Sequence, residues 1–236
     1  MADAESRDDA LMIARVLEPE AMDSVDEARE YDLMDHAAVN AAFVAGLLAA
    51  VGARRSLLLG GIVVDVGTGT ARIPSELCHR EPACRVVGVD LAHEMLRVGL
   101  RNVTDAGLSG RVWLQRARVT ALPFRDACVP VLMSNSLMHH LPDPAAAFGE
   151  MHRVVSPGGV MFVRDLFRPA SAAELDHLVH VHAAAATAAQ RQLFADSLHA
   201  AFTLDEVRSL VRTFPFSKVS VEATSDRHWT LVASRS

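Results

Sequence analysis

Runs of β-branched hydrophobic residues alternate along the chain with stretches in which hydrophobic residues recur every three or four positions. The first run, Ile62-Val63-Val64, leads into a turn with two glycines, and a helical pattern follows the turn. Further strands are predicted at 86–90, 111–116, 129–134, 160–165 and 216–222, with a loop and a final strand within 225–232. Strands that alternate with helices form a mostly parallel sheet with helices on both faces, so the pattern predicts a doubly wound α/β fold.

Two helical regions lie outside this alternation. Residues up to about 51 carry hydrophobic side chains at helical spacing, which predicts an N-terminal helical cap over 1–55. About fifty residues separate the fifth strand from the sixth, more than one crossover helix needs. Capping boxes at Ser171 and Thr203 predict one helix from 171 to about 187 or beyond and another from 204 to about 213. We therefore expect a helical lid at about 170–201, inserted into a main domain over 56–236, all within one compact unit.

The two-glycine turn is the first candidate for a binding site. Gly67 and Gly69 have no Cβ, so a ligand can lie directly against the backbone of this turn. About twenty residues later, a second apolar run ends at Asp90, whose carboxylate can accept both hydrogen bonds from a ribose diol. Two strands, a glycine turn and an acid at this spacing predict a site for a nucleotide-like ligand.

With Asp65, both glycines, Asp90 and a Pro-Gly-Gly turn at 157–159, the segment from about Tyr31 to Leu166 resembles the class I S-adenosylmethionine-dependent methyltransferases. It is most similar to the small-molecule enzymes of the ubiquinone/menaquinone-biosynthesis type. The resemblance implies a Rossmann-like, seven-stranded sheet with an antiparallel C-terminal strand. It also implies transfer of a methyl group from S-adenosyl-L-methionine to a small-molecule acceptor, with S-adenosyl-L-homocysteine as the product. The cofactor-binding residues that it implies are Asp65, Gly67, Thr68, Gly69, Thr70, Asp90, Leu91, Met95, Arg118, Val119, Ser134 and Asn135.

The chain departs from this family at two positions. Arg118 stands where related enzymes commonly have an acid that accepts a hydrogen bond from the adenine amino group, and a guanidinium has no acceptor. Either backbone and apolar contacts near Val119 hold the adenine, or the affinity for the cofactor is reduced, or the cofactor is altered. Pro130 opens the fourth strand, where proline is tolerated because its missing N–H need not belong to the ladder.

The candidate catalytic residues are His139 and His140, which follow the fourth strand at the edge where open α/β sheets bind ligands. They are expected to line the site or to act as a general base, and packing at the start of a helix is the alternative. Methyl displacement from a sulfonium depends mainly on alignment and on the exclusion of water. No metal site is therefore predicted, and the histidines at 177, 180 and 182 are interpreted as a solvated or pocket-lining face.

The resemblance and the strand ends also suggest residues that contact the acceptor. Tyr31 is expected to cover the cofactor or the acceptor, with an amphipathic helix-edge residue as the alternative. An arginine beyond the fifth strand is expected to hold an anionic acceptor, with a strand-end ion pair as the alternative. We also expect the C-terminal hairpin to face the lid. The candidate substrate residues are Tyr31, Arg164, Asp165, Arg168, His228 and Trp229.

The net charge of −6 at pH 7, without any run of basic residues, argues against a nucleic-acid partner. Three scattered cysteines favour a reducing compartment, and the acidic N-terminus does not have the pattern of a signal peptide. The apolar stretch at 41–53 is interpreted as too short and too interrupted by glycine to span a bilayer. We therefore predict a cytoplasmic protein that is a monomer or a homodimer.

Two other functions remain open from the sequence. Arg118 and Pro130 are compatible with a catalytically inactive binding protein on the same fold. A nicotinamide-dependent oxidoreductase is a third hypothesis, although Arg72 occupies the position of the third glycine of the dinucleotide fingerprint and weighs against it.

Overall fold

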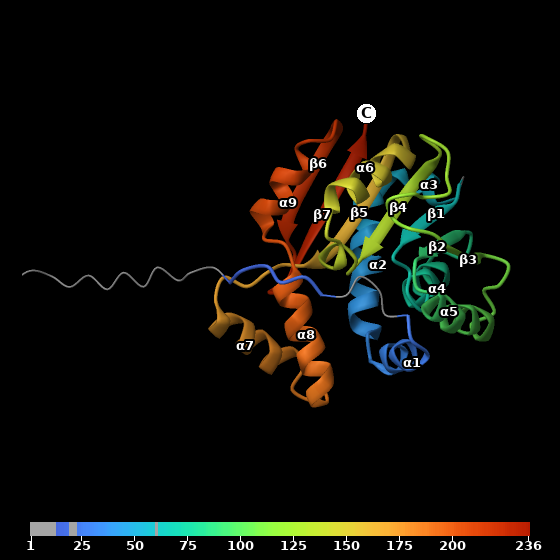
Figure 1. Ribbon diagram of the computed structural model, residues 1–236. Helices are drawn as coiled ribbons and strands as arrows, with labels where there is room; N and C mark the ends of the chain where they lie inside the picture. The colour runs from blue at the N-terminus through green and yellow to red at the C-terminus, as the bar shows by residue number, and fades with distance from the viewer. Residues whose placement is uncertain (1–12, 19–22, 60) are drawn as a thin grey trace, which may run out of the picture.

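The structure is a computed structural model that describes residues 13–18, 23–59 and 61–236. Its centre is one seven-stranded sheet with the strand order β3-β2-β1-β4-β5-β7-β6 (Figure 1). The first five strands in chain order are parallel, and β7 runs antiparallel to both of its neighbours. The strands are β1 (Val63–Val66), β2 (Val86–Asp90), β3 (Val112–Arg116), β4 (Val129–Asn135), β5 (Val155–Leu166), β6 (Phe216–Ala223) and β7 (His228–Arg235). The predicted fold class, including the antiparallel C-terminal strand, is confirmed.

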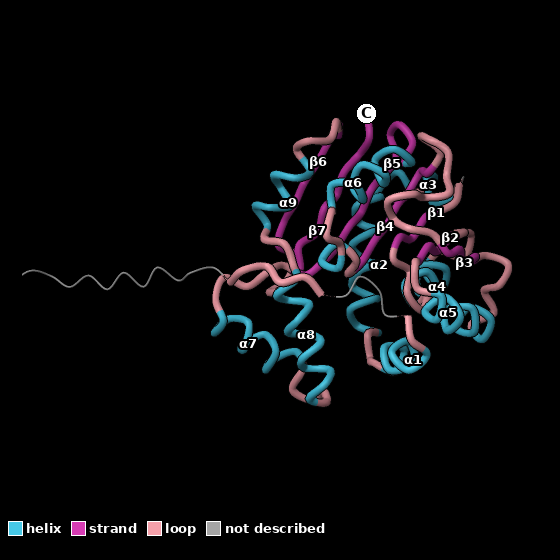
Figure 2. The backbone as a smooth tube through the Cα atoms, in the orientation of Figure 1, coloured by secondary structure: helices cyan, strands magenta, loops and turns pink. Residues whose placement is uncertain are grey.

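Helices cover both faces of the sheet (Figure 2), because successive residues of each strand point to opposite sides. Val64 of β1 packs in one cluster with Phe148 and Val207, whereas the neighbouring Val63 packs in a second cluster with Phe43. The helices beside the sheet are α2 (Ala37–Val51), α3 (Ser56–Leu59), α4 (Arg72–Arg80), α5 (His93–Asp105), α6 (Pro144–Val154) and α9 (Leu204–Val211). Both faces thus contribute to the core.

The helix α2 is part of this core. Its side chains Phe43, Val44, Leu47 and Val51 are buried against the sheet. Together with the 3₁₀ turn at 52–54, the helix forms a helical stretch, Ala37–Arg54, of 18 residues that is long and apolar enough to cross a membrane, and 22% of this stretch is buried. It is longer than the apolar stretch at 41–53 interpreted from the sequence. The core helix of a protein can pass the same test of length and composition.

The lid consists of two helices, α7 (Ala172–His182) and α8 (Ala188–Ala200). The expectation of one helix from 171 to about 187 is wrong, because a third capping box begins a new helix at Thr187. The Thr187 hydroxyl accepts from the Gln190 backbone N–H at 3.2 Å, and the Gln190 side chain accepts from the Thr187 N–H at 3.0 Å. The crossover helix at 204–211 begins at its predicted residue.

Proline 130 lies at an irregularity in the sheet. The pairing of β4 with β5 shifts between Val129 and Val131, so no regular ladder bond is lost at Pro130. This confirms that the proline is tolerated there. β5 begins at Val155, five residues before the strand that the sequence predicted, because Val155 pairs with Val129 on the other side of this shift.

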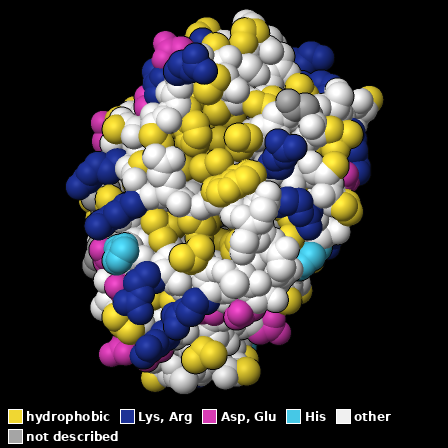
Figure 3. All heavy atoms as spheres, turned by 90° about the vertical axis from the view of Figure 1, so that its right-hand side faces the viewer, with side chains coloured by type: hydrophobic (Ala, Val, Ile, Leu, Met, Phe, Trp, Pro, Cys, Tyr) yellow, Lys and Arg dark blue, Asp and Glu magenta, His cyan; other side chains and the backbone are white. Residues whose placement is uncertain are grey.

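The carboxyl ends of the parallel strands meet at the edge of the sheet where α1 (Val25–Leu33), α7 and α8 lie (Figure 1). Residues 13–18 cross this edge, where the Val16 N–H donates to the His199 carbonyl at 3.1 Å. A different side of the molecule, on which β3 forms the sheet edge, carries hydrophobic side chains near its centre with basic side chains around them (Figure 3). The carboxyl ends of the parallel strands are thus the edge of the sheet that α1, α7, α8 and residues 13–18 cover.

Candidate active site

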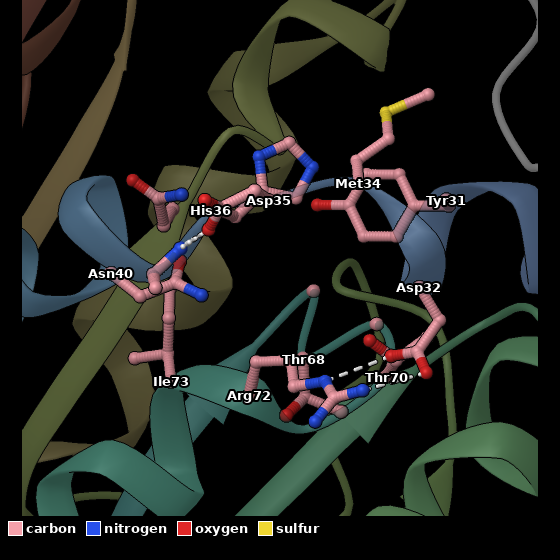
Figure 4. A pocket seen from close by; sticks show the side chains of 14 residues that line it. Tyr31, Asp32, Met34, Asp35, His36, Asn40, Thr68, Thr70, Arg72 and Ile73 are labelled. Atoms are coloured by element: carbon pink, nitrogen blue, oxygen red, sulfur yellow. Dashed lines mark hydrogen bonds and ion pairs between the residues drawn. The ribbon is translucent and has the colours of Figure 1, made fainter.

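Two hollows meet at the glycine turn that follows β1. The larger is a cavity of about 260 Å³ between this turn and the connection from α1 to α2 (Figure 4). The smaller, about 40 Å³, is lined by the ends of β2 and β3 and by the segment after β4. Gly67 lines both hollows. They lie at the carboxyl ends of parallel strands, where open α/β sheets bind ligands.

The turn itself requires glycine. Gly67 has a φ of +76°, and a Cβ added there would lie 3.0 Å from the side chain of Leu137. Gly69 has a φ of +53°, and its N–H donates to Asp90 Oδ2 at 2.7 Å. The other oxygen of Asp90 accepts from the Ala92 N–H at 2.9 Å. The predicted ribose acid therefore also fixes the shape of the glycine turn.

Acidic groups lie in and near the two hollows: Asp32 and Asp35 line the larger one and Asp90 the smaller one. Asp65, beneath them, is 2% exposed, and burial raises its pKa to about 7, with the charge of Asp90 adding to the rise. Burial also raises the pKa of Asp90, although its hydrogen bonds from Ala92 and Gly69 oppose the shift. The pKa of Tyr31 is raised by burial and by the nearby acids Asp90 and Asp32. A negative field of this kind favours a cationic ligand.

Three buried polar atoms of this cavity have no hydrogen-bond partner among the described residues. They are His36 Nε2, Thr68 Oγ1 and Asn135 Oδ1, and all three residues line the cavity. Buried polar side-chain atoms in native proteins are nearly always paired. Burial lowers the pKa of His36, so its imidazole is neutral at pH 7. The three atoms point to a polar ligand in the cavity.

An ion pair holds α1 over the glycine turn. Asp32 accepts from Arg72 Nε at 2.9 Å and from Arg72 Nη2 at 2.8 Å (Figure 4). Asn102 Nδ2 donates to the same carboxylate at 2.8 Å. Tyr31, one residue earlier, lines the cavity and packs against the cluster that contains Met95. The arginine that replaces the third glycine of the fingerprint therefore docks the helix that covers the site.

Comparison with known proteins agrees with this geometry. The family described as "Methyltransferase domain" matches residues 64–163, which contain the glycine turn, Asp90 and most of β5. A ubiquinone/menaquinone biosynthesis C-methyltransferase from Geobacter sp. is 32% identical over 110 residues, or 46% of this chain and 47% of that protein. A demethylmenaquinone methyltransferase from Porphyromonas gingivalis is 31% identical over 46% of this chain and 45% of its own length. The match thus spans about half the length of these curated relatives.

Solved structures share the architecture over most of the chain. A SAM-dependent methyltransferase from Aquifex aeolicus has a TM-score of 0.62 at 16% identity, covering 89% of this chain and 97% of that one. A phosphoethanolamine N-methyltransferase from Haemonchus contortus, solved with S-adenosylhomocysteine, has a TM-score of 0.59 at 14% identity and covers 90% of this chain and 60% of its own. Residues 64–163 thus match a methyltransferase family, and the fold over most of the chain is that of solved methyltransferases. These findings agree with the resemblance drawn from the sequence.

The methyltransferase domain brings most of the predicted cofactor residues to the two hollows. Those lining the larger cavity are Gly67, Thr68, Gly69, Thr70 and Asn135. Those lining the smaller hollow are Gly67, Asp90, Leu91, Arg118 and Val119. Asp65, Met95 and Ser134 line neither hollow, and Asp65 lies buried near Asp90. Met95 packs against α1, and the Ser134 hydroxyl donates to the Val66 carbonyl at 2.7 Å, joining β4 to β1.

The predicted catalytic histidines lie outside both hollows of the methyltransferase domain. His139 is 3% exposed, and its Nδ1 lies 2.5 Å from Asp165 Oδ1. Burial alone lowers the pKa of His139, but Asp165 and Glu18 outweigh it and raise the pKa to about 9. His140 lies beside it and also faces Glu18, at 3.1 Å. The turn after β4 directs both rings toward residues 13–18, so they line neither hollow, and their expected place beside the acceptor and role as a base stay predictions.

Most of the predicted substrate residues have structural partners. Arg168 forms an ion pair with Glu206 at 2.8 Å, which is the alternative that the sequence left open. Arg164 lies between aromatic rings and donates from Nε to the Thr230 hydroxyl at 3.0 Å. Asp165 is buried against His139 and accepts from the Met138 N–H at 2.6 Å. Of the predicted substrate residues, Tyr31 lines a hollow.

The C-terminal hairpin reaches the lid through residues other than those predicted. Trp229 is fully buried in the core with Val207, because residues 229, 231 and 233 of β7 point to the face that α9 covers. The expectation that Trp229 faces the lid is therefore wrong. His228 is 9% exposed and bonds Ser225 at 2.8 Å, and burial lowers its pKa to about 4. Asp226 makes the contact with α7, through His182 Nε2 at 2.5 Å.

Several lining residues were not predicted. The connection from α1 to α2 supplies polar groups to the cavity, and the segment after β4 supplies apolar ones to the smaller hollow. The polar run that follows Tyr31, set between two helical patterns, is the sequence signal that marks the first group. The missed residues include Asp32, Met34, Asp35, His36, Asn40, Arg72, Leu137 and Leu141.

Proposed function

We propose that this chain transfers the methyl group of S-adenosylmethionine to a small-molecule acceptor. The observation that supports this most is the pair of hollows joined at Gly67, one bordered by Asp90 and the other by acids and unpaired polar atoms. S-adenosylmethionine has a nucleoside at one end and an amino acid next to a positive sulfur at the other. The nucleoside suits the hollow bordered by Asp90, and the amino-acid end suits the larger cavity. The chain's relatives include proteins named as methyltransferases.

The residues present fit this donor. Asp90 and Leu91 would hold the ribose and adenine, with Val119 contributing an apolar contact. The glycine turn, Thr70 and Asn135 would hold the amino-acid end in the larger cavity. Asp32, and Asp65 once it is ionised, would place negative charge near a donor that carries a positive sulfur, which increases its binding without forming a bond.

The bound donor supplies an electrophilic methyl group and leaves as a neutral thioether. The chain contributes alignment and exclusion of water, because α1 is docked over the cavity by Arg72. An acceptor that must lose a proton needs a base within reach of the cavity. His36 is neutral there and its Nε2 has no partner among the described residues, so we assign the proton-accepting role to His36 rather than to His139.

The acceptor is proposed only as a small molecule. Two relatives are named for methylation in menaquinone or ubiquinone biosynthesis, so an acceptor of that class is the first to test. The matched segment 64–163 does not include α7 and α8, which are proposed to cover the acceptor. The cytoplasmic location and the monomeric or homodimeric state stay predictions.

Calorimetric titration of the full chain tests the proposal. We expect one molecule of S-adenosylhomocysteine to bind per chain, and Asp90→Asn to weaken binding at least tenfold because the ribose loses a charged acceptor. NAD and NADPH, titrated under the same conditions, are expected not to bind. A folded chain that binds neither S-adenosylmethionine nor S-adenosylhomocysteine would contradict the proposal. Transfer of a labelled methyl group to candidate quinone precursors then tests the acceptor.

A second prediction concerns Arg118, which lines the smaller hollow with Val119. Arg118→Asp restores an acceptor for the adenine amino group, and one such hydrogen bond strengthens binding by roughly three- to tenfold. The matched control is Arg125→Asp, an equal change of charge at an exposed residue of the same connection, outside both hollows. Equal affinities for the wild type and both variants would show that backbone and apolar contacts hold the adenine.

A further inference from the structure

Three potential metal ligands converge outside the methyl-transfer site. Glu18, His139 and His140 each offer one ligand atom, and these atoms lie within 4.8 Å of one another. Glu18 Oε1 is 3.2 Å from His139 Nε2 and 3.1 Å from His140 Nδ1. A single carboxylate oxygen therefore faces ring nitrogens of two neighbouring histidines.

The fold holds these groups in place from two directions. His139 and His140 lie on the 3₁₀ turn η2 (Met138–His140), with their ring centroids 4.1 Å apart. Glu18 comes from residues 13–18, which Arg15 fastens by donating to the carbonyls of His139 and Leu141, each at 3.0 Å. The ligand set is therefore assembled by the fold, from segments that are far apart in sequence.

His139 also has a carboxylate behind its ring, as histidines that bind metals commonly do. His139 Nδ1 lies 2.5 Å from Asp165 Oδ1, so the Nδ1–H is directed at a carboxylate and Nε2 is directed at Glu18. Asp165 is itself fixed by the N–H groups of Met138 and Leu166, each at 2.6 Å. A carboxylate behind an imidazole fixes the ring orientation and increases its basicity as a ligand.

We propose that Glu18, His139 and His140 form a three-ligand site for a divalent transition-metal cation, for which Zn²⁺ is the probe. Ligand atoms bound tetrahedrally at about 2.0 to 2.1 Å lie about 3.3 Å from one another, close to the two separations found here. Two imidazoles and one carboxylate suit Zn²⁺ or a similar transition metal better than Mg²⁺, which prefers oxygen. Three protein ligands leave a fourth position open.

Such a cation would join residues 13–18 to the turn after β4. Glu18 already receives a hydrogen bond from the Ser197 hydroxyl of α8 at 3.1 Å, so the cation would link three segments at the carboxyl edge of the sheet. The site does not depend on the proposed methyl transfer, because it uses residues that line neither hollow. The alternative occupant is a proton that His139 shares with Glu18.

Calorimetry with ZnCl₂ on the full chain, freed of metals by a chelator and carrying no histidine tag, tests the proposal. We expect one Zn²⁺ per chain and a higher Tm when Zn²⁺ is present. Co²⁺ in place of Zn²⁺ is expected to give visible absorption bands of a tetrahedral nitrogen and oxygen site. Glu18→Gln and His140→Ala are each expected to weaken Zn²⁺ binding at least tenfold. His180→Ala, an exposed histidine of α7, is the matched control and should bind as the wild type does.

Two results would overturn the metal site. One is a wild-type chain that binds no Zn²⁺ while folded, which would leave the proton as the occupant. The other is equal Zn²⁺ affinity in the wild type and Glu18→Gln, with His180→Ala weakened instead. Glu18→Gln keeps the size of the side chain and an oxygen that can accept from the Ser197 hydroxyl, and circular dichroism and the metal-free Tm verify its fold. Binding of S-adenosylhomocysteine by the same samples keeps this test separate from that of the methyl-transfer proposal.

Discussion

Gly67→Ala is expected to reduce the affinity for S-adenosylhomocysteine at least a hundredfold. The residue has a φ of +76°, and the new methyl group would approach the Leu137 side chain to 3.0 Å at the point where the two hollows join. The left-handed backbone costs an alanine about 1 to 2 kcal/mol, and moving Leu137 or the turn adds to this. Calorimetric titration measures the affinity, and thermal unfolding measures the stability.

Gly107→Ala separates crowding of the site from backbone strain. Gly107 has a φ of +68°, close to that of Gly67, but nothing lies within 4 Å of an added Cβ. We expect this variant to lose about 1 kcal/mol of unfolding free energy and to bind the ligand as the wild type does. Equal affinities for both variants would show that the glycine turn does not contact the ligand.

The sequence predicts those residues of the site whose positions follow from the backbone conformation of a turn or from the end of a parallel strand. Gly67 and Gly69 are recognisable because no other residue suits a left-handed turn against a ligand. Asp90 is recognisable because parallel strands end at the same edge, which brings a residue about twenty positions later beside the first turn. These rules relate spacing along the chain to proximity in space, and they correctly predicted the sheet as well.

The missed part depends on contacts between distant segments. Arg72 is noticeable in the sequence because it occupies the position of the third glycine of the dinucleotide fingerprint. Its role, however, depends on Asp32, forty residues earlier, and on the docking of α1. His139 follows the correct strand, but its neighbour Asp165 and the segment that carries Glu18 determine where its ring points. The start of α8 at Thr187 was missed for a local reason. Its capping box is visible in the sequence, but it lies inside an alanine-rich stretch whose pattern predicts one continuous helix.

Asp65 is expected to make both stability and ligand affinity depend on pH. Its pKa in the folded chain is about 7, above the usual 3.8, so the folded state holds a proton that the unfolded state releases. Its contribution to stability is thus complete below pH 3.8 and is lost as the pH rises through 7. This difference corresponds to about 4 kcal/mol for a fully buried carboxyl.

The cationic donor reverses this preference, because it stabilises the ionised carboxylate. Binding of S-adenosylmethionine should therefore release a proton below pH 7, and the affinity should rise by up to about tenfold per pH unit until it levels off above pH 7. Asp65→Asn should bind more weakly with no such dependence, and at pH 8 it should unfold at a higher temperature than the wild type without ligand. Titrations in two buffers of different ionisation enthalpy count the protons released.

Asp35→Asn is the control, since Asp35 lines the same cavity as an exposed acid. It should keep the pH dependence of the wild type, because solvent screens its charge. A wild-type affinity that stays constant from pH 5.5 to 8 would mean that the carboxyl of Asp65 does not respond to the ligand. In that case the negative field of the site would come from Asp90 and Asp32, and Asp65 would serve only to support the turn from beneath.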